Sequence, residues 1–496
     1  MTFEIVFVLL SLLGMVAALI ADKMRPGMIL FSVVVLFLCA GILTPKEMLE
    51  GFSNKGMITV ALLFLVSEGI RQSGTLGQVI KKLLPQGKTT VFKAQLRILP
   101  SVAFISAFLN NTPVVVIFAP IIKHWAKSVN LPATKFLIPL SYVTILGGIC
   151  TLIGTSTNLV VHGMILEAGF EGFSMFELGK VGIFIAIAGI IYIFLFSKRL
   201  LPDARPDTAV PDEEVEEGEK LHRVEAVLGA RFPGINKKLK DFNFQRHYGA
   251  EVKEIKTRNG QRFVTNLDDV VLHEGDTLVV MADDTFIPTW GESSVFVLLT
   301  NGNEPDTSGK KKRWFALLLL VLMIVGATVG ELPVTKEMFP DIKLDMFFFV
   351  SITTIIMAWT NLFPARKYTK YISWDILITI ACAFAISKAM VNSGVADSVA
   401  KFIIGLSDDY GPHVLLAMVF IITNLFTELI TNNAAAALAF PLALSISAQL
   451  GVSPTPFFVV ICMAASASFS TPIGYQTNLI VQGIGNYKFT DFVRIG

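Results

Sequence analysis

Phe108-Leu109-Asn110-Asn111-Thr112-Pro113 interrupts an apolar run that extends from Leu96 to Trp125. A continuous membrane helix does not place two asparagines and a proline at its centre, because proline removes a backbone hydrogen bond and amides are costly in lipid. Two half-helices that meet here form a re-entrant hairpin, which lipid tolerates only where protein or a cavity surrounds the irregular backbone. The stretch therefore predicts a hairpin over residues 96–127 whose tip holds an ion.

The second half of the chain repeats this arrangement. Thr431-Asn432-Asn433-Ala434 matches Asn110-Asn111-Thr112-Pro113 at an offset of 321, and Ile473-Gly474-Tyr475-Gln476-Thr477-Asn478 matches Ile153-Gly154-Thr155-Ser156-Thr157-Asn158 at 320. Upstream, Asn392-Ser393-Gly394 lies 320 residues after Gln72-Ser73-Gly74. Two halves with paired helix breaks are typical of a secondary transporter whose site lies at the repeat interface.

The composition predicts a polytopic membrane protein. Of 496 residues, 53% are hydrophobic and 16% are charged, which is too apolar for a soluble protein of this length. The net charge of +2 gives no support for a nucleic-acid partner. The chain has no Walker loop, nucleophile elbow or paired-carboxylate motif, so no enzyme is expected. Its six histidines share no metal-ligand spacing with carboxylates or cysteines, and the only metal expected is sodium.

Basic residues predict how the chain crosses the membrane. Lys and Arg cluster after the first span, on both sides of the first hairpin and at Lys198-Arg199, and short basic loops stay in the cytoplasm. This pattern predicts five crossings plus a hairpin that enters from inside, with the N-terminus outside. The odd count inverts the next repeat, so its hairpin, at about residues 413–450, is expected to enter from outside.

Three domains are predicted. Residues 1–199 form the first membrane repeat and residues 314–496 the second. Residues 200–313 begin with an acidic linker at 212–217 and continue with short alternating strands, which predict a small α+β domain. Basic residues flank this insert, which places it in the cytoplasm of a multi-pass cell-membrane protein. The fold class is thus all-α in the membrane, with two inverted repeats around a soluble insert. The repeat also predicts one more helix than the sequence contains, so we expect either that the sequence is a fragment or that the second half lacks its final span.

The helix breaks supply the candidate site. Side-chain amides, hydroxyls and freed carbonyls are neutral oxygens that replace the water shell of Na⁺. Two sodium sites are predicted, one in each half, from Asn110, Asn111, Gly154 and Asn158, and from Asn432, Asn433, Gly474 and Asn478. An anion between them would be held by amides, hydroxyls and helix N-termini. The candidate anion ligands are Asn111, Thr112, Thr155, Ser156, Thr157, Thr431, Asn432, Thr471, Gln476 and Thr477. The alternative is that these polar groups only bond between helices.

Two acidic residues lie near these motifs. Glu428 precedes Thr431 by one helical turn, and it either tunes a cation site, carries a proton, or is satisfied by neighbouring hydroxyls. Glu68 and Lys388 occupy equivalent positions in the two halves and could form a pair across the pseudo-two-fold axis.

With these motifs, the chain resembles the divalent anion/sodium symporter family (SLC13) of the ion transporter superfamily. That family carries Ser-Asn-Thr at two hairpin tips, and here the tips keep the central Asn in Asn110-Asn111-Thr112 and Thr431-Asn432-Asn433. The resemblance implies elevator-type transport driven by Na⁺, usually by a homodimer. The Asn-Asn-Thr-Pro form with a cytoplasmic insert resembles the sulfate branch. Residues 221–287 resemble the TrkA-C domain of potassium-channel regulators, which implies dimerisation and in some cases a small regulatory ligand.

The sequence thus predicts a Na⁺-coupled symporter of a small divalent anion, with sulfate first and a C4-dicarboxylate second. A cation/proton exchanger of the same superfamily, with Glu428 cycling the proton, is the alternative. A channel gated by the insert is the third reading, and it lacks any repeated filter of backbone carbonyls.

Overall fold

The computed structural model describes most of the chain and confirms the predicted fold class. The described residues are 3–21, 24–203, 221–229, 232–257, 261–283, 286–290, 295–300, 310–405, 411–472 and 474–496. Seven of the described helices are long and apolar enough to cross a membrane, and four shorter apolar helices accompany them. The acidic linker predicted at 212–217 lies outside the described residues.

The described residues of the first half form ten α-helices. They are α1 (Phe3–Ala21), α2 (Pro26–Cys39), α3 (Pro45–Glu50), α4 (Lys55–Gln72), α5 (Thr75–Leu83), α6 (Val91–Ser106), α7 (Asn111–Ser128), α8 (Leu137–Gly148), α9 (Ser156–Glu167) and α10 (Gly179–Leu200). The predicted hairpin is the α6–α7 pair, broken at residues 107–110. Its first arm begins at Val91 and not at residue 96, because the Thr90 hydroxyl caps the helix by accepting from Lys93 N at 3.4 Å.

The second half repeats the series. Its described helices are α13 (Lys310–Gly330), α14 (Pro333–Met338), α15 (Met346–Trp359), α16 (Tyr368–Tyr371), α17 (Trp374–Asn392), α18 (Val395–Gly405), α19 (Gly411–Leu429), α20 (Asn432–Leu450), α21 (Thr455–Ser466), α22 (Gln476–Gly485) and α23 (Phe489–Ile495). The second hairpin is α19–α20, and the second broken span is α21–α22. Short 3-10 turns complete the helical structure at Gly51–Ser53, Ala133–Lys135, Leu239–Asp241, Leu267–Asp269 and Ala365–Lys367.

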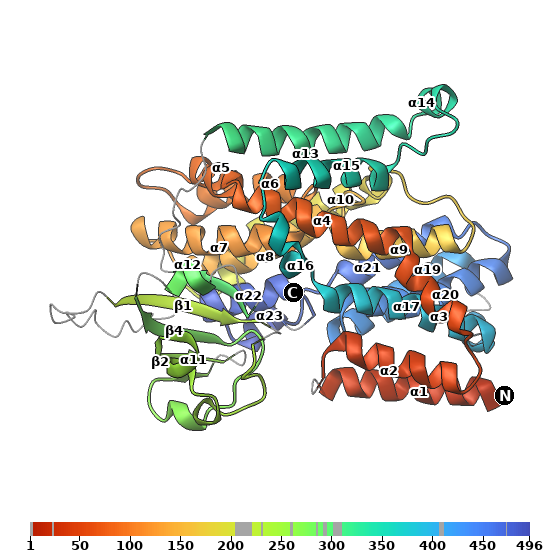
Figure 1. Cartoon of the computed structure of the whole chain (residues 1–496), viewed down its shortest axis with the longest axis horizontal. Helices are drawn as coiled ribbons and strands as arrows, with labels where there is room; N and C mark the ends of the chain where they lie inside the picture. The colour runs from red at the N-terminus through yellow and green to blue at the C-terminus, as the bar shows by residue number, and fades with distance from the viewer. Residues whose placement is uncertain are drawn as a thin grey trace.

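The two halves exchange partners across the molecule. α2 of the first half packs on α17 of the second, and α15 of the second packs on α4 of the first. In the same way α7 packs on α22, and α20 packs on α9. Figure 1 shows α7 near the insert at one end of the long axis, and α19 and α20 toward the opposite end. This reciprocal packing brings both hairpins and both broken spans together between the halves.

The insert is a small antiparallel sheet with short helices. Its strands are β1 (His222–Leu228), β2 (Glu251–Lys256), β3 (Arg262–Phe263), β4 (Thr277–Ala282) and β5 (Phe296–Thr300), and its helices are α11 (Phe244–Tyr248) and α12 (Phe286–Trp290). The strand order is β3-β2-β4-β1-β5, with Leu278 of β4 paired to both Ala226 and Ile255. An aromatic cluster around Phe232 and Phe296 fills the core beside the sheet.

One predicted ion pair is wrong. The Glu68 carboxylate does not reach Lys388, because it accepts hydrogen bonds from Arg71 Nη2 at 2.7 Å and from Gln72 Nε2 at 2.6 Å on its own helix. Residues three and four positions apart share a helix face, and this local contact is made without bringing distant helices together. Glu68 and Lys388 are related by the repeat but are not paired.

Candidate functional site

Four helices begin at the interface between the two halves. They are α7, α9, α20 and α22, and their first residues follow Asn110, Thr155, Thr431 and Tyr475. None of these four residues caps its helix with a side-chain hydrogen bond. The first turn of each helix therefore presents backbone N–H groups and a partial positive charge that no cap has used.

The tip of the first hairpin is held by Asn111. Its Oδ1 accepts a hydrogen bond from Ser106 Oγ at 2.7 Å, and its Nδ2 donates to Tyr475 Oη at 2.6 Å. The broken span packs closely on this amide, because a Cβ added at Gly148 would lie 2.6 Å from Asn111 Oδ1. Only glycine fits there, so the amide oxygen and the carbonyls around Gly148 and Gly154 are brought together.

Asn158 completes the first group of oxygens. Its Nδ2 donates to the carbonyl oxygens of Gly148 at 3.3 Å and Thr151 at 2.9 Å, which fixes the unwound turn. Its Oδ1 is fully buried and has no hydrogen-bond partner among the described residues. A buried amide oxygen without a partner costs free energy unless a cation or a donor completes it. The donor set of neutral oxygens fits Na⁺.

The second half builds a similar group. Thr427 Oγ1 donates to Asn432 Oδ1 at 2.9 Å, as Ser106 does to Asn111. Asn478 Nδ2 donates to the carbonyls of Ser468 at 2.9 Å and Thr471 at 3.2 Å. Asn478 Oδ1, however, accepts from Ser141 Oγ at 2.6 Å, so its oxygen is already paired.

Polar side chains connect the four helix starts to one another. Thr112 Oγ1 donates to Gln476 Oε1 at 3.2 Å. On the other side, Asn433 Oδ1 accepts from Thr157 Oγ1 at 3.2 Å and from Ser156 Oγ at 3.4 Å. We call these five residues, together with Thr155 and Tyr475, the central group. It contains residues of both halves, and Tyr475 connects it to Asn111 of the first group of oxygens.

The remaining predicted residues fall in three places. Asn110 lines a small cavity with Ser67 and Ser156. Thr471 Oγ1 accepts from Gly474 N at 3.2 Å and so shapes the second unwound turn, while Thr477 is buried and accepts from Ser141 Oγ at 2.8 Å. The hydroxyl of Thr431 is buried without a partner in the part of the chain that the structure describes.

Tyr475 is the residue that the sequence analysis missed. Its hydroxyl lies between Asn111 Nδ2 and Thr155 Oγ1, at 2.6 Å and 3.0 Å, and so joins both halves. The repeat contained the signal, because Tyr475 stands at the position equivalent to Thr155. The same comparison pairs Ser106 with Thr427, whose hydroxyls bond the two tip amides.

Glu428 supports the second unwound turn. Its Oε1 accepts from the backbone N–H groups of Phe469 and Ser470, both at 3.0 Å, and its Oε2 accepts from Ser468 Oγ at 3.3 Å. Of the three roles considered from the sequence, these contacts match satisfaction by neighbouring donors, although the backbone supplies two of them. The described residues contain no cluster of three or more His, Cys, Asp or Glu side chains suited to a metal ion.

Comparison with known proteins agrees with this architecture. The chain matches the family model CitMHS, described as a citrate transporter, over residues 16–448 and 341–495. It is 30% identical to the uncharacterized transporter sll0640 of Synechocystis, covering 94% of this chain and 89% of the relative. It is 28% identical to a putative sulfur deprivation response regulator of Chlamydomonas reinhardtii, covering 94% of each.

A probable sodium/sulfate cotransporter 3 of Chlamydomonas reinhardtii is 23% identical, covering 96% of this chain and 84% of the relative. The apolar helices, the paired broken spans and these matches agree on a multi-pass membrane transporter. The chain therefore belongs to the CitMHS citrate transporter family, within the ion transporter superfamily.

Proposed function

We propose that the protein is a sodium-coupled symporter of a small divalent oxyanion, with sulfate as the first candidate and a C4-dicarboxylate as the second. The observation that carries this proposal is the convergence of four uncapped helix N-termini on the central group. Helix N-termini favour anions through their free N–H groups and their dipoles. Amides and hydroxyls such as Thr112 and Gln476 supply further donors without adding a fixed charge.

Sodium binds at the two groups of neutral oxygens. In the first half the ligands are Asn111, Asn158 and the carbonyls near Gly154, and the unpaired Asn158 Oδ1 supports this assignment. In the second half they are Asn432, Asn478 and the carbonyls near Gly474. Asn433 belongs with the anion ligands, because it faces Ser156 and Thr157 across the interface. A cation on each side raises the local positive potential, so anion and sodium binding favour each other.

The size of Tyr475 favours a compact anion. Where the first half has Thr155, the second half places a phenol whose hydroxyl reaches the centre of the interface. This ring occupies volume that an extended dicarboxylate would need, while its hydroxyl can donate to an oxyanion. The sodium/sulfate name of one relative agrees with this preference.

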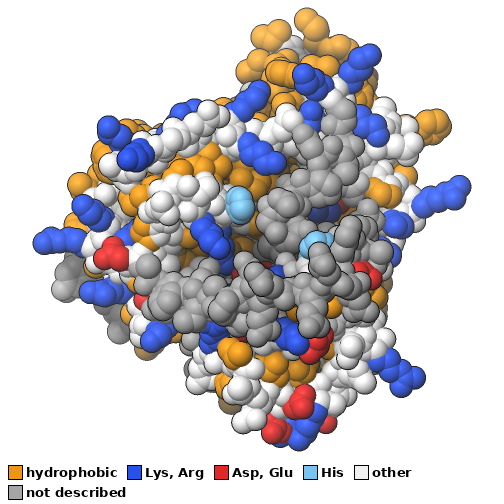
Figure 2. Space-filling model, turned by 90° about the vertical axis from the view of Figure 1, so that its left-hand side faces the viewer, with side chains coloured by type: hydrophobic (Ala, Val, Ile, Leu, Met, Phe, Trp, Pro, Cys, Tyr) orange, Lys and Arg blue, Asp and Glu red, His pale blue; other side chains and the backbone are white. Residues whose placement is uncertain are grey.

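The insert lies on the cytoplasmic side of the cell membrane. Figure 2 looks onto the end of the molecule that carries the insert, and Lys and Arg side chains are spread across it. Three helices also carry an exposed lysine in the last turn, namely Lys81 in α5, Lys127 in α7 and Lys198 in α10. Short basic segments stay in the cytoplasm. The proposal keeps the three domains expected from the sequence, with a TrkA-C-like module at residues 221–287 that is open to a regulatory ligand. It also includes an elevator mechanism in a homodimer.

Uptake into proteoliposomes tests the proposal. Labelled sulfate, succinate and citrate are offered separately, with an inward Na⁺ gradient or an equal K⁺ gradient, and protein-free liposomes are the control. Sulfate uptake that requires Na⁺ is the expected result. Na⁺-driven uptake of succinate or citrate alone would overturn the preference for sulfate. Na⁺ movement driven by a pH gradient, with no anion transported, would assign the protein to the exchangers.

A further inference from the structure

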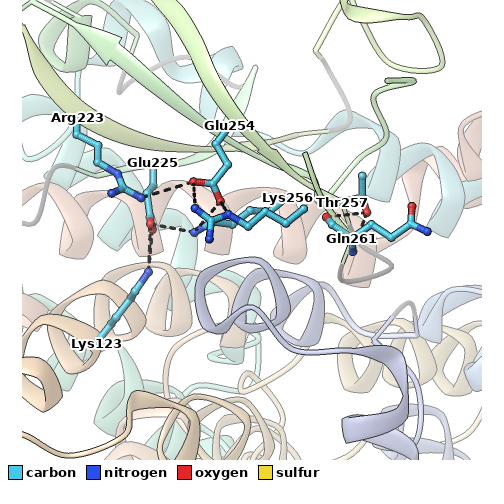
Figure 3. A network of polar contacts seen from close by, with 8 residues as sticks. Lys123, Arg223, Glu225, Glu254, Lys256, Thr257 and Gln261 are labelled. Carbon is cyan, nitrogen blue, oxygen red and sulfur yellow. Dashed lines mark hydrogen bonds and ion pairs between the residues drawn. The ribbon is translucent and has the colours of Figure 1, made fainter. Parts of the chain in front are cut away.

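The insert contacts the same helices that build the central group. Its strand β1 carries Glu225, whose Oε1 and Oε2 each accept a hydrogen bond from Lys123 Nζ of α7 at 3.1 Å. Figure 3 shows Lys123 extending from α7 toward the sheet, where Lys256 also reaches Glu225. Lys123 and Glu225 are both largely buried, at 22% and 17% exposure of the side chain. Water screens this ion pair far less than an exposed one, so it ties the insert to the hairpin arm.

A second contact joins the insert to α22. A Cβ added at Gly483 of α22 would lie 2.5 Å from Thr277 Oγ1, and a Cβ added at Gly275 would lie 3.3 Å from Leu479 Cδ2. Glycine on both sides of the contact lets the turn before β4 lie directly against the helix. Gln476, at the start of α22, is exposed and lines a small gap with Glu274 and Gly275.

The internal repeat contains an equivalent face on α9, which packs on another helix and not on the insert. Leu159 and Gly163 of α9 are the counterparts of Leu479 and Gly483, at an offset of 320. Leu159 and Gly163 lie where α9 packs on the start of α4. A Cβ added at Gly163 would lie 2.6 Å from Asn54 Oδ1, and a Cβ added at Gly56 would lie 2.8 Å from the Leu159 carbonyl oxygen. The counterpart of Asn54 is Trp374, at the start of α17. Yet α17 and α22, both described in full, do not pack along one another as α4 and α9 do.

Inverted repeats relate the two end states of a transporter, because each half in one state takes the arrangement that the other half has in the opposite state. In the opposite state α22 is then expected to pack on the start of α17, as α9 packs on α4 here. Trp374 is 47% exposed in this structure, so its side chain is open to such a partner. The insert and α17 thus require the same face of α22.

We propose that the insert is a state-selective stop: it docks on the Leu479–Gly483 face of α22 in the state seen here and must leave before α17 can take that face. The inference rests on the proposed transport function and adds a control element to it. The insert can leave α22 without breaking a hydrogen bond of Thr277, because the buried hydroxyl of this residue has no hydrogen-bond partner among the described residues. Loss of the insert contact favours the opposite state and thereby changes the rate of the cycle.

Cross-linking tests the competition. Two cysteine pairs are made in a background whose four native cysteines are replaced: Thr277→Cys with Gly483→Cys, and Trp374→Cys with Gly483→Cys. A short cleavable thiol cross-linker should join either pair, and conditions that increase one product should decrease the other. Should Gly483→Cys impair folding, Glu274→Cys with Leu479→Cys reports the same insert contact. If the Trp374 pair forms no product under any gradient of Na⁺ and sulfate, the proposal is wrong.

Transport of the cross-linked protein gives the second readout. Joining the insert to α22 should reduce Na⁺-driven sulfate uptake at least tenfold, and cleaving the linker should restore it. The matched control joins Lys253→Cys to Glu251→Cys, an exposed pair within β2, and should leave uptake unchanged. Undiminished uptake with the insert joined to α22 would mean that the insert travels with that helix, which contradicts the proposal.

A charge variant separates this inference from the proposed function. Lys123→Ala should lower the Thr277–Gly483 product about threefold and raise the Trp374–Gly483 product, whereas Lys127→Ala, an exposed lysine one turn later, should change neither. The yields of the two cross-linked products can be measured whether or not the protein transports an anion. If no tested anion is transported but the yields shift as expected, the substrate assignment fails and the competition stands. Equal yields in the Lys123 and Lys127 variants would overturn the competition.

Discussion

The two halves of the membrane domain have the same arrangement of helices, but the oxygens at their helix breaks have different hydrogen-bond partners. In the first half the Asn158 oxygen is left unpaired in the described residues, whereas its counterpart on Asn478 is occupied by Ser141. The first half has Ala107 where the second has Glu428, and Thr155 where the second has Tyr475. The difference teaches that the repeat supplies the geometry of the helix breaks. Single substitutions then leave the oxygens of the first half neutral and partly unpaired, and place a carboxylate beside those of the second half.

Removing the tip amides should have the largest effect. Asn111→Ala loses the hydrogen bonds to Ser106 and Tyr475, which should cost about 2 kcal/mol and lower the apparent Na⁺ affinity ~30-fold. Asn432→Ala loses one hydrogen bond, to Thr427, which should cost about 1 kcal/mol and lower the affinity ~5-fold. The Na⁺ dependence of sulfate uptake measures both. Unchanged Na⁺ dependence in the two variants would rule out cation binding at the tips.

Exchanging the tyrosine for its counterpart should change selectivity. Tyr475→Thr copies Thr155, removes the ring and one bond to Asn111, and is expected to weaken sulfate uptake about tenfold while succinate competes better. Competition assays measure the ratio of the two anions. Tyr475→Phe is the control, since it keeps the ring volume and should lose sulfate affinity without gaining succinate. If both variants gain succinate equally, the ring does not limit substrate size.

Neutralising the acid of the second half should have a moderate effect. Glu428→Gln keeps one acceptor oxygen for the N–H groups of Phe469 and Ser470 but loses the charge, at a cost of about 1 kcal/mol. Na⁺-driven sulfate uptake is expected to fall about fivefold and to remain driven by Na⁺. A complete loss of transport together with a lost response to a pH gradient would favour proton exchange through Glu428.

Acid should have the smallest effect, and only on the insert. Burial acts to raise the pKa of Glu225, but the charges of Lys123 and Lys256 outweigh it and lower the pKa from 4.5 to about 2. A lowered pKa in the folded state means that the ion pair stabilises the contact fully above about pH 4.5 and loses this effect as the pH falls toward 2. Thiolate reactivity itself falls with acid, so the Thr277–Gly483 yield is divided by that of the Lys253–Glu251 cysteine pair at the same pH. This ratio should be constant between pH 8 and pH 5. A decrease within that range would show that another group controls docking.

Much of the fold could be predicted from local features. Apolar runs bounded by basic residues indicated the spans, and the Asn-Asn pairs indicated both hairpin tips, because lipid tolerates polar breaks only at buried sites. The Glu68–Lys388 pair failed for the opposite reason: equivalence in a repeat does not imply contact, and Arg71 and Gln72 are nearer along the helix. The contact of Asn433 with Ser156 and Thr157 could not be predicted from spacing either, because it forms between α20 and α9 of different halves.

Spacing and composition along the chain were enough to establish a membrane protein of two inverted halves, with neutral polar breaks at matching positions around a soluble insert. Only the tertiary structure decided which oxygens face one another, that Tyr475 joins the halves, and that the insert rests on α7 and α22. The reason is physical. Hydropathy and helix breaks are properties of short segments, whereas a hydrogen bond between residues more than 300 positions apart depends on how whole helices pack, and no local pattern encodes that geometry.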